Sequence, residues 1–224
     1  YTEYILNIVA DTKITPKTDV PSVVKKVKDT NDTTGDTTEW QDSADYDIGD
    51  DVPFQLTATL ANNIESYKTY SLKFNDTLSK GLDYNNDAVI KLGDQDVTKS
   101  FTPSYDATAK TLTFTCDNIK AFGAKNSDKI VVEYTAKLNE NAEIGGTIGN
   151  KNTVYLEFSN NPNNGGEGDR GETPEDKVIV FTYKLTVKKI EKVDGKDKPL
   201  TGAEFTLFKK VNGKDEPVKV EKVL

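Results

Sequence analysis

The chain alternates hydrophobic and polar residues over many short stretches, and this period of two predicts β-strands. Turn clusters such as Asn85-Asn86-Asp87 and Gly145-Gly146 separate the stretches, and one helical turn is expected at residues 118–123. So many short strands at this spacing predict an all-β fold, a sandwich with Greek-key-like connections. The predicted strands of its body are residues 23–28, 52–60, 69–75, 88–92, 110–116, 129–138 and 153–158.

The pattern divides the chain into four parts. Residues 1–20 read as the last strand of a preceding domain followed by a connector, and residues 21–162 as one β-sandwich domain. Residues 163–177, rich in Asn and Gly, read as an inter-domain linker. Residues 178–224 restart the strand pattern and are expected to be the N-terminal part of a second, truncated β-sandwich. The polar stretch 29–39 is expected to form an exposed loop.

Three predicted strands each place a polar residue on their apolar side. Lys25 is in phase with the valines of its own strand, Asn152 with the apolar residues of 153–158, and Asp50 with those of 52–60. A lysine that faces a core is costly unless its charge is removed or paired. The sequence therefore predicts an amine, a carboxamide and a carboxylic acid that face one core.

Neighbouring residues leave alternatives open for each of the three. Lys25 could extend from a strand edge into water, as lysines usually do. A second candidate acid is Glu133, but it alternates with Val132 and Tyr134, so a solvated position is expected for it. The remaining alternatives are Lys26 for Lys25, Asn150 for Asn152, and Asp47 and Asp51 for Asp50.

Sequence patterns around the three residues resemble a known family. They are Pro-x-Val-x-Lys, Ile-Gly-Asp-x-Val-x-Phe, and Asn-x-Val-x-Leu-x-Phe followed by Ser-Asn-Asn-Pro. Together they resemble the major-pilin domains of Gram-positive sortase-assembled pili, over roughly residues 20–165. The resemblance implies immunoglobulin-like domains in tandem. It also implies an intramolecular isopeptide bond between Lys25 and Asn152, promoted by Asp50.

A second resemblance begins after the predicted linker. The run Leu-x-Gly-Ala-x-Phe-x-Leu at residues 200–207, after a Val-x-Lys strand, is similar to the Cna protein B-type domain. Leu185, Val187 and Lys189 share one face of that strand, so Lys189 is the candidate cross-link lysine of the second domain. Its acid and Asn partners are expected beyond Leu224.

The chemistry of the first bond follows from the residue types. Burial favours the neutral form of the Lys25 amine and the protonated form of the Asp50 carboxyl, because it disfavours both charges. The neutral amine can attack the Asn152 carboxamide while the acid stabilises the oxyanion, and ammonia leaves. Closing a loop between residues 25 and 152 restricts the unfolded chain by about 5 kcal/mol on the model used for disulfides. Placed on the first and last strands of a domain, the bond would resist a pulling force.

Composition narrows the class of function. The chain has 224 residues with 29 Lys and Arg against 37 Asp and Glu, and a net charge of −8 argues against binding to nucleic acid. It contains no His, which excludes Ser-His-Asp catalysis and His-ligated metal sites. The single cysteine, Cys116, allows no internal disulfide and is expected to be a small buried side chain. No apolar run reaches membrane-spanning length, and no cofactor is indicated.

Calcium is the one metal that the sequence leaves open. Acidic turns occur around residues 29–36 and 167–176, but neither follows the periodic Asp pattern of a calcium loop. Solvated acidic turns without an ion are the commoner outcome, so no metal site is predicted.

The expected function is structural and not enzymatic. The resemblance implies a backbone pilin of an extracellular, cell-wall-anchored pilus, joined head to tail with other pilin subunits by sortase. The alternative is a wall-anchored adhesin of the same domains that binds a host protein or glycan. Neither a signal peptide nor a sorting signal is visible, so the chain is expected to be a fragment of a longer precursor.

Overall fold

The computed structural model describes residues 19–162, 168–200, 202 and 206–218 of the chain. The predicted strand of a preceding domain falls within residues 1–18 and therefore lies outside the described residues. Within the described ranges, no helix is long and apolar enough to cross a membrane.

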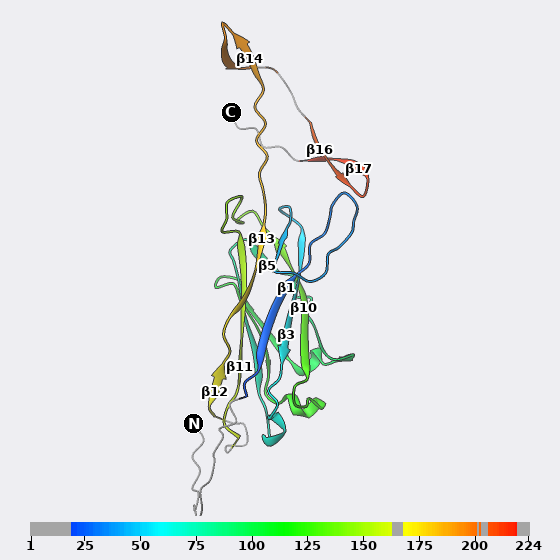
Figure 1. Ribbon diagram of the computed structural model, residues 1–224, viewed down its shortest axis with the longest axis vertical. Coiled ribbons are helices and arrows are strands. Elements are labelled where there is room, and N and C mark those ends of the chain that lie inside the picture. Colours follow the sequence, from blue (N-terminus) through cyan, green and yellow to red (C-terminus); the bar gives the residue numbers. More distant parts are fainter. Residues whose placement is uncertain (1–18, 163–167, 201, 203–205, 219–224) are drawn as a thin grey trace, which may run out of the picture.

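Two facing β-sheets form the body of the molecule, which confirms the predicted all-β sandwich (Figure 1). The first sheet has six strands in the order β1-β3-β10-β6-β7, with β5 paired to β10. The second has seven strands in the order β2-β13-β11-β4-β9-β8, with β12 paired to β11. The first sheet comprises β1 (Ser22–Val27), β3 (Asp51–Thr59), β5 (Leu82–Tyr84), β6 (Val89–Leu92), β7 (Gln95–Asp96) and β10 (Lys129–Leu138). The second comprises β2 (Ser43–Asp45), β4 (Leu72–Leu78), β8 (Thr102–Asp106), β9 (Thr111–Cys116), β11 (Asn150–Ser159), β12 (Arg170–Glu172) and β13 (Asp176–Phe181).

Short 3-10 helices connect strands of the sandwich, and those that lie wholly within the described residues are η1 (Ile64–Ser66), η2 (Thr98–Ser100) and η3 (Ile119–Phe122). The predicted helical turn corresponds to η3. The Asn118 side chain accepts a hydrogen bond from the Lys120 backbone N–H at its start, and Gly123 ends it at a φ of 92°. A left-handed residue of this kind is a common helix terminator, and glycine adopts it without strain.

The core lies between the sheets and is filled by every second residue of the long strands. In β3 the residues Val52, Phe54, Leu56 and Ala58 are fully buried, and their neighbours are partly exposed. β10 pairs antiparallel with β3 and shows the same alternation, so the predicted period of two is confirmed in both strands. Cys116 at the end of β9 is buried, as its sequence context predicts.

The predicted end of the first sandwich at residue 162 is wrong, because two further strands, β12 and β13, belong to it. Val178 and Val180 of β13 are fully buried in the first sandwich, where β13 pairs with β11 and, in parallel, with β2. The predicted linker, residues 163–177, therefore includes β12 and the start of β13. The run of apolar residues at 178–181 resembles the start of a new domain, but its partners are the strands that precede it.

Two separate hairpins follow the sandwich. They are β14 (Ile190–Val193) with β15 (Lys196–Pro199), and β16 (Leu207–Val211) with β17 (Lys214–Val218). Residues 182–189 form no strand, and Leu185, Val187 and Lys189 are exposed instead of facing a core. The predicted motif at 200–207 lies partly outside the described residues. The role suggested for Lys189 stays a prediction.

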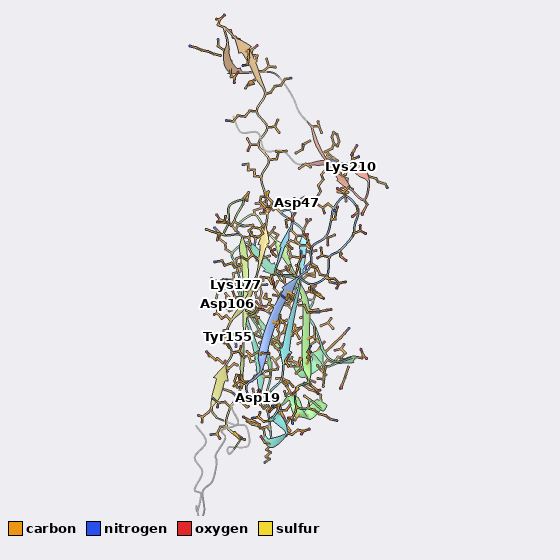
Figure 2. All side chains as sticks on the ribbon, in the orientation of Figure 1. Asp19, Asp47, Asp106, Tyr155, Lys177 and Lys210 are labelled. Carbon is orange, nitrogen blue, oxygen red and sulfur yellow. The ribbon has the colours of Figure 1, made fainter. Side chains whose placement is uncertain are left out.

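The chain enters the sandwich near one end and leaves it at the opposite end. Asp19, just before β1, lies near one end, and Asp47 lies near the opposite end, next to the β16–β17 hairpin (Figure 2). The last strand, β13, leaves the sandwich at that second end (Figure 1). The β16–β17 hairpin contacts the predicted exposed loop: the backbone N–H groups of Asn212 and Gly213 donate hydrogen bonds to the carbonyl oxygens of Asp32 and Thr33.

Candidate cross-linking site

Four polar side chains meet in the middle of the core. Lys25 of β1 and Tyr134 of β10 come from the six-stranded sheet, and Asp76 of β4 and Asn152 of β11 come from the seven-stranded sheet. Lys25 and Asn152 are fully buried, Asp76 is 1% exposed and Tyr134 is 3% exposed. Each lies on the apolar face of its strand, so ordinary strand alternation brings all four into the space between the sheets.

The four side chains form a continuous hydrogen-bonded cluster. The Lys25 ammonium is 2.7 Å from Asp76 Oδ2 and donates to the Tyr134 hydroxyl at 3.1 Å. The Tyr134 hydroxyl donates to Asp76 Oδ2 at 2.7 Å. Asn152 Nδ2 in turn donates to the Tyr134 oxygen at 2.7 Å. The predicted amine and carboxamide therefore share a site, with a carboxylic acid and a phenol beside them.

The surroundings of the cluster are apolar and aromatic. Lys25 Nζ lies 5.3 Å from the centre of the Phe54 ring and 5.4 Å from that of Tyr134. Burial lowers the pKa of Lys25 to about 8, against the opposing attraction of Asp76. Burial also raises the pKa of Asp76, so both groups are displaced towards their neutral forms.

Two oxygen atoms of the cluster have no donor. Neither Asp76 Oδ1 nor Asn152 Oδ1 accepts a hydrogen bond from any residue that the structure describes, although both are buried. An unpaired buried acceptor costs about 1–3 kcal/mol. A proton carried by the Asp76 carboxyl would turn one of these acceptors into a donor, which fits the raised pKa of Asp76.

Asp50 lies elsewhere, which corrects the prediction that it faces the same core as Lys25. The strand β3 begins at Asp51, and Gly49 with a φ of 102° turns the chain just before it, so the alternation does not continue through Asp50. The Asp50 carboxylate is half-buried and accepts a hydrogen bond from the Asp47 backbone N–H at 3.1 Å. The acid in contact with Lys25 is Asp76.

The other residues that the sequence offered as candidates for the cross-linking site lie outside the cluster. Glu133 is exposed, as its parity predicts, and accepts a hydrogen bond from Gln55. Lys26 pairs with Asp42 near the surface. Asn150 is buried on the same face of β11 as Asn152, but its amide bonds to the backbone of Glu143 and Val180. Asp47 and Asp51 are exposed and pair with Lys209 and Lys137.

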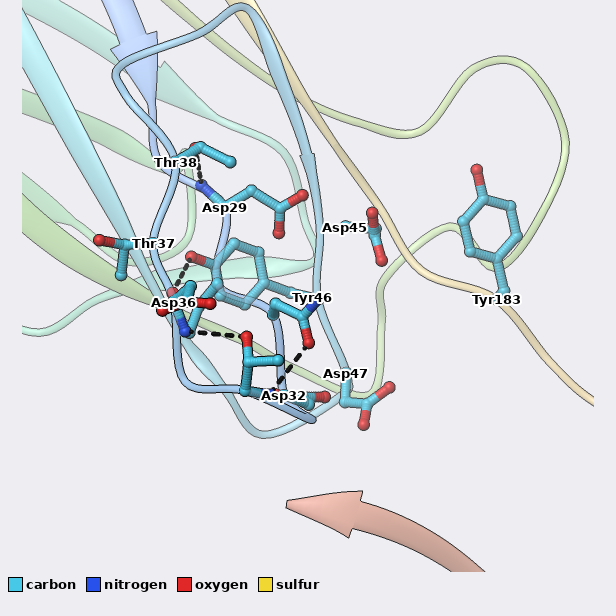
Figure 3. A pocket seen from close by; sticks show the side chains of 12 residues that line it. Asp29, Asp32, Asp36, Thr37, Thr38, Asp45, Tyr46, Asp47 and Tyr183 are labelled. Carbon is cyan, nitrogen blue, oxygen red and sulfur yellow. Dashed lines mark hydrogen bonds between the residues drawn. The ribbon is translucent and has the colours of Figure 1, made fainter. Parts of the chain in front are cut away.

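A second polar region lies at the end of the sandwich next to the β16–β17 hairpin. Asp29, Asp36, Asp45 and Tyr46 are among the residues that line a hollow of about 630 Å³ there (Figure 3). Asp32 and Asp47 also line this hollow, and carboxylate oxygens of Asp32, Asp47 and Asp50 lie within 4.8 Å of one another. The Lys209 ammonium lies 2.6 Å from Asp47 and 3.3 Å from Asp32. A lysine therefore already balances this acidic group, of which Asp32 belongs to one of the two stretches, 29–36 and 167–176, where the sequence left calcium open.

The chain matches a protein family over just over half its length. Residues 48–162 match the family described as Gram-positive pilin backbone subunit 2, Cna-B-like domain. A curated relative, the trypsin-resistant surface T6 protein of Streptococcus pyogenes serotype M6, is 26% identical over 215 residues. This match covers 86% of the chain but 37% of the relative, so the chain spans little more than a third of that protein's length.

Solved pilin structures share the fold. The T6 backbone pilin of Streptococcus pyogenes has a TM-score of 0.53 at 22% identity, over 79% of this chain and 39% of that one. A C-terminal fragment of the major pilin GBS80 of Streptococcus agalactiae has a TM-score of 0.54 at 21% identity, over 74% and 57%. The major pilin BcpA of Bacillus cereus has a TM-score of 0.53 at 17% identity, over 71% and 39%. With the fold and the family match in agreement, the chain belongs to the Gram-positive pilin backbone subunits with a Cna-B-like domain.

Proposed function

We propose that this chain is part of the backbone subunit of a Gram-positive pilus, and that a self-formed amide bond between Lys25 and Asn152 makes its sandwich resist extension. The observation that carries the proposal is the buried cluster. An amine with a lowered pKa, a carboxylic acid with a raised pKa and a carboxamide meet there away from water. A stable fold does not need such a costly group of polar side chains, whereas a chemical reaction does.

Asp76 takes the role of the promoting acid. The neutral Lys25 amine attacks Cγ of Asn152, forming the Nζ–Cγ bond while the carbonyl electrons move to Oδ1. A proton on Asp76 stabilises this oxyanion by a hydrogen bond. The Cγ–Nδ2 bond then breaks. One proton passes from Nζ to Nδ2 and ammonia leaves, so Asp76 returns to its starting state. The reaction occurs once per chain and is a self-modification without turnover.

The bond would join the two sheets across the core. Lys25 is on the first strand of the sandwich, but Asn152 is on β11, which β12 and β13 follow, and so it is not on the last strand. A force applied at the two ends of the sandwich would pass through β1, the bond, and the chain from residue 152 to β13. Residues 26–151 would carry no load. The β13 strand stays protected by its pairing with β11 and by the Lys25 backbone N–H, which donates to Asp176 at 2.7 Å.

An intact mass tests the bond. We expect the 224-residue chain to weigh one ammonia less than its sequence, and Lys25→Ala and Asp76→Ala to have their full calculated masses. Asp50→Ala is the matched control, because its carboxylate lies outside the cluster, and it should still lose ammonia. A full calculated mass for the parent chain would exclude the bond. Loss of ammonia in Asp76→Ala would exclude Asp76 as the acid.

Pulling single molecules tests the load-bearing role. When the parent chain is stretched from its two ends, we expect unfolding to release the chain beyond residue 152 and none of residues 26–151. Lys25→Ala should release those residues as well, and at lower force. Equal extensions for the two proteins would overturn the mechanical role even if the bond forms.

The proposed function includes assembly of the subunit into a pilus, and the family match supports this part of the proposal. Family membership and the pilin relatives support a location in a pilus at the cell wall, with other pilin subunits joined head to tail by sortase. Since the matched relatives are named as pilins and a surface protein, a structural role without enzymatic turnover is the function they support. Among the residues that the structure describes, no observation favours binding of a host ligand.

A further inference from the structure

We propose that the Tyr134 hydroxyl is a catalytic group of the cross-linking reaction, which delivers the proton that lets the Asn152 amide nitrogen leave as ammonia. This inference rests on the cross-link proposed above. It assigns a role to a residue that sequence reasoning treated only as part of the apolar face of β10.

The hydroxyl contacts all three partners of the reaction. Its oxygen lies 2.7 Å from Asn152 Nδ2, 2.7 Å from Asp76 Oδ2 and 3.1 Å from Lys25 Nζ. These distances are within the range for direct proton transfer between hydrogen-bonded groups. Tyr134 therefore stands between the nitrogen that attacks, the acid, and the nitrogen that departs.

The leaving nitrogen needs a proton donor of its own. An amide nitrogen departs from a tetrahedral intermediate only when protonated, because its anion is a very poor leaving group. Lys25 Nζ and the Tyr134 hydroxyl are the two donors to Asp76 Oδ2, and Asn152 Nδ2 donates to the Tyr134 oxygen. In the part of the chain that the structure describes, the Tyr134 oxygen is thus the group through which Nδ2 reaches Asp76.

The proton moves along this chain of contacts and the step balances. After attack, Asp76 passes on the proton that it carries, and Nζ replaces that proton at Asp76 Oδ2 across 2.7 Å. Asp76 gives a proton to the Tyr134 oxygen while the Tyr134 hydroxyl gives its own to Nδ2. The Cγ–Nδ2 bonding pair stays on nitrogen and ammonia departs. Asp76 and Tyr134 end as they began.

The phenol is held in place for this role by its ring. The Tyr134 ring stacks on Phe54 with centroids 5.4 Å apart and meets Tyr84 edge to face at 5.6 Å. Burial raises its pKa well above the usual value, so the hydroxyl keeps its proton until the reaction draws on it. An aromatic side chain would fill this space without a hydroxyl, so the hydroxyl is not required for packing.

Tyr134→Phe removes the hydroxyl and keeps the ring. We expect cross-link formation to slow by about 100-fold or more, the range for loss of one acid–base group. The full chain is made by a short pulse of cell-free synthesis, and intact mass is followed over time for loss of ammonia. Tyr84→Phe is the matched control. It removes a hydroxyl from the same aromatic cluster, but the Tyr84 hydroxyl accepts a hydrogen bond from the Ala88 backbone N–H. This variant should react at the parent rate.

A second substitution separates chemistry from folding. Cell-free synthesis can place 3,5-difluorotyrosine at position 134, which retains the hydroxyl and increases its acidity. If Tyr134 donates the proton, the rate should rise several-fold, whereas the same replacement of Tyr84 should not change it. This readout also applies if Tyr134→Phe does not fold.

The outcomes distinguish this inference from the function on which it rests. If the parent chain never loses ammonia, the cross-link itself is excluded. If the parent reacts and Tyr134→Phe reacts at the same rate, the cross-link stands and the role of Tyr134 is excluded. A parent rate with difluorotyrosine at position 134 likewise excludes proton donation by Tyr134.

Discussion

Two lysine–aspartate pairs of this molecule have nearly the same length and opposite behaviour. Lys25 and Asp76 are 2.7 Å apart with side chains that are 0% exposed. Lys209 and Asp47 are 2.6 Å apart with side chains that are 36% and 55% exposed. The pKa of Lys25 is lowered to about 8 by burial, whereas the pKa of Lys209 is raised, chiefly by its hydrogen bond to Asp47.

The comparison shows that burial and not distance decides what a lysine can do. At the surface, water solvates both charges, and the pair remains ionic and contributes little. In the core, the cost of desolvation exceeds the attraction between the partners and displaces the amine towards its neutral, nucleophilic form. The same two residue types thus make a surface contact in one place and a candidate reaction centre in the other.

The largest expected effect comes from removing the acid of the buried pair. Asp76→Ala should prevent the cross-link and lower the free energy of unfolding by at least about 5 kcal/mol. The lost loop constraint accounts for about that amount, and the amine left alone in the core adds to it. Denaturant unfolding, with intact mass on the same samples, measures both effects.

Two variants serve as controls for this result. Asn152→Ala should also lose the cross-link but retain the Lys25–Asp76 pair, so it should be destabilised less than Asp76→Ala. Asp47→Ala breaks the exposed pair and should cost less than about 1 kcal/mol. Equal losses for Asp47→Ala and Asp76→Ala would show that burial does not separate the two pairs.

The pH dependence of stability gives a smaller effect with a definite sign. In Asn152→Ala no bond can form, and Lys25 should retain its folded pKa of about 8 against 10.5 for the unfolded chain. Between these values the unfolded chain binds more protons than the folded one, so the free energy of unfolding rises with pH. We expect a gain of about 2 kcal/mol between pH 8 and pH 10.

The double variant Lys25→Met/Asn152→Ala isolates this contribution. It lacks the Lys25 proton but retains every other titrating group, so the difference between the two variants belongs to Lys25. Urea unfolding at several pH values supplies the measurement. A difference that is constant from pH 8 to pH 10 would mean that the buried amine titrates normally.

The sequence predicted the buried lysine and asparagine of the site but not the aspartate that pairs with the lysine. Strand alternation predicted the faces of Lys25 and Asn152, because both lie inside long strands with clear apolar neighbours. It missed Asp76, which is in phase with Leu72, Phe74 and Leu78, because Asn75-Asp76 reads as a turn and the predicted strand ended at residue 75. Continuing the alternation to Leu78 would have found it.

The predicted face of Asp50 and the predicted domain of β13 were wrong for a related reason. Parity places a residue on a face only while the strand continues, and Gly49 turns the chain immediately before Asp50. Similarly, the local pattern of 178–181 predicts a strand but not its partners, since pairing with β11 and β2 depends on tertiary contacts. The hydroxyl of Tyr134 gave no signal, because a tyrosine among apolar residues is typical of any core strand.

The smallest expected effect concerns the exposed pair. Lys209 links the β16–β17 hairpin to Asp47 and Asp32 of the sandwich, beside the bonds from the Asn212 and Gly213 amides to the loop. Lys209→Ala should therefore speed hydrogen exchange at those two amides by no more than about fivefold, the equivalent of 1 kcal/mol. High salt should reduce the difference, because it screens exposed charges. Lys210→Ala, whose partner Asp215 lies within the hairpin, should leave both amides unchanged. If exchange instead accelerated by orders of magnitude and did not depend on salt, the exposed pair would be as strong as a buried one, and burial could no longer explain why Lys25 and not Lys209 is poised to react.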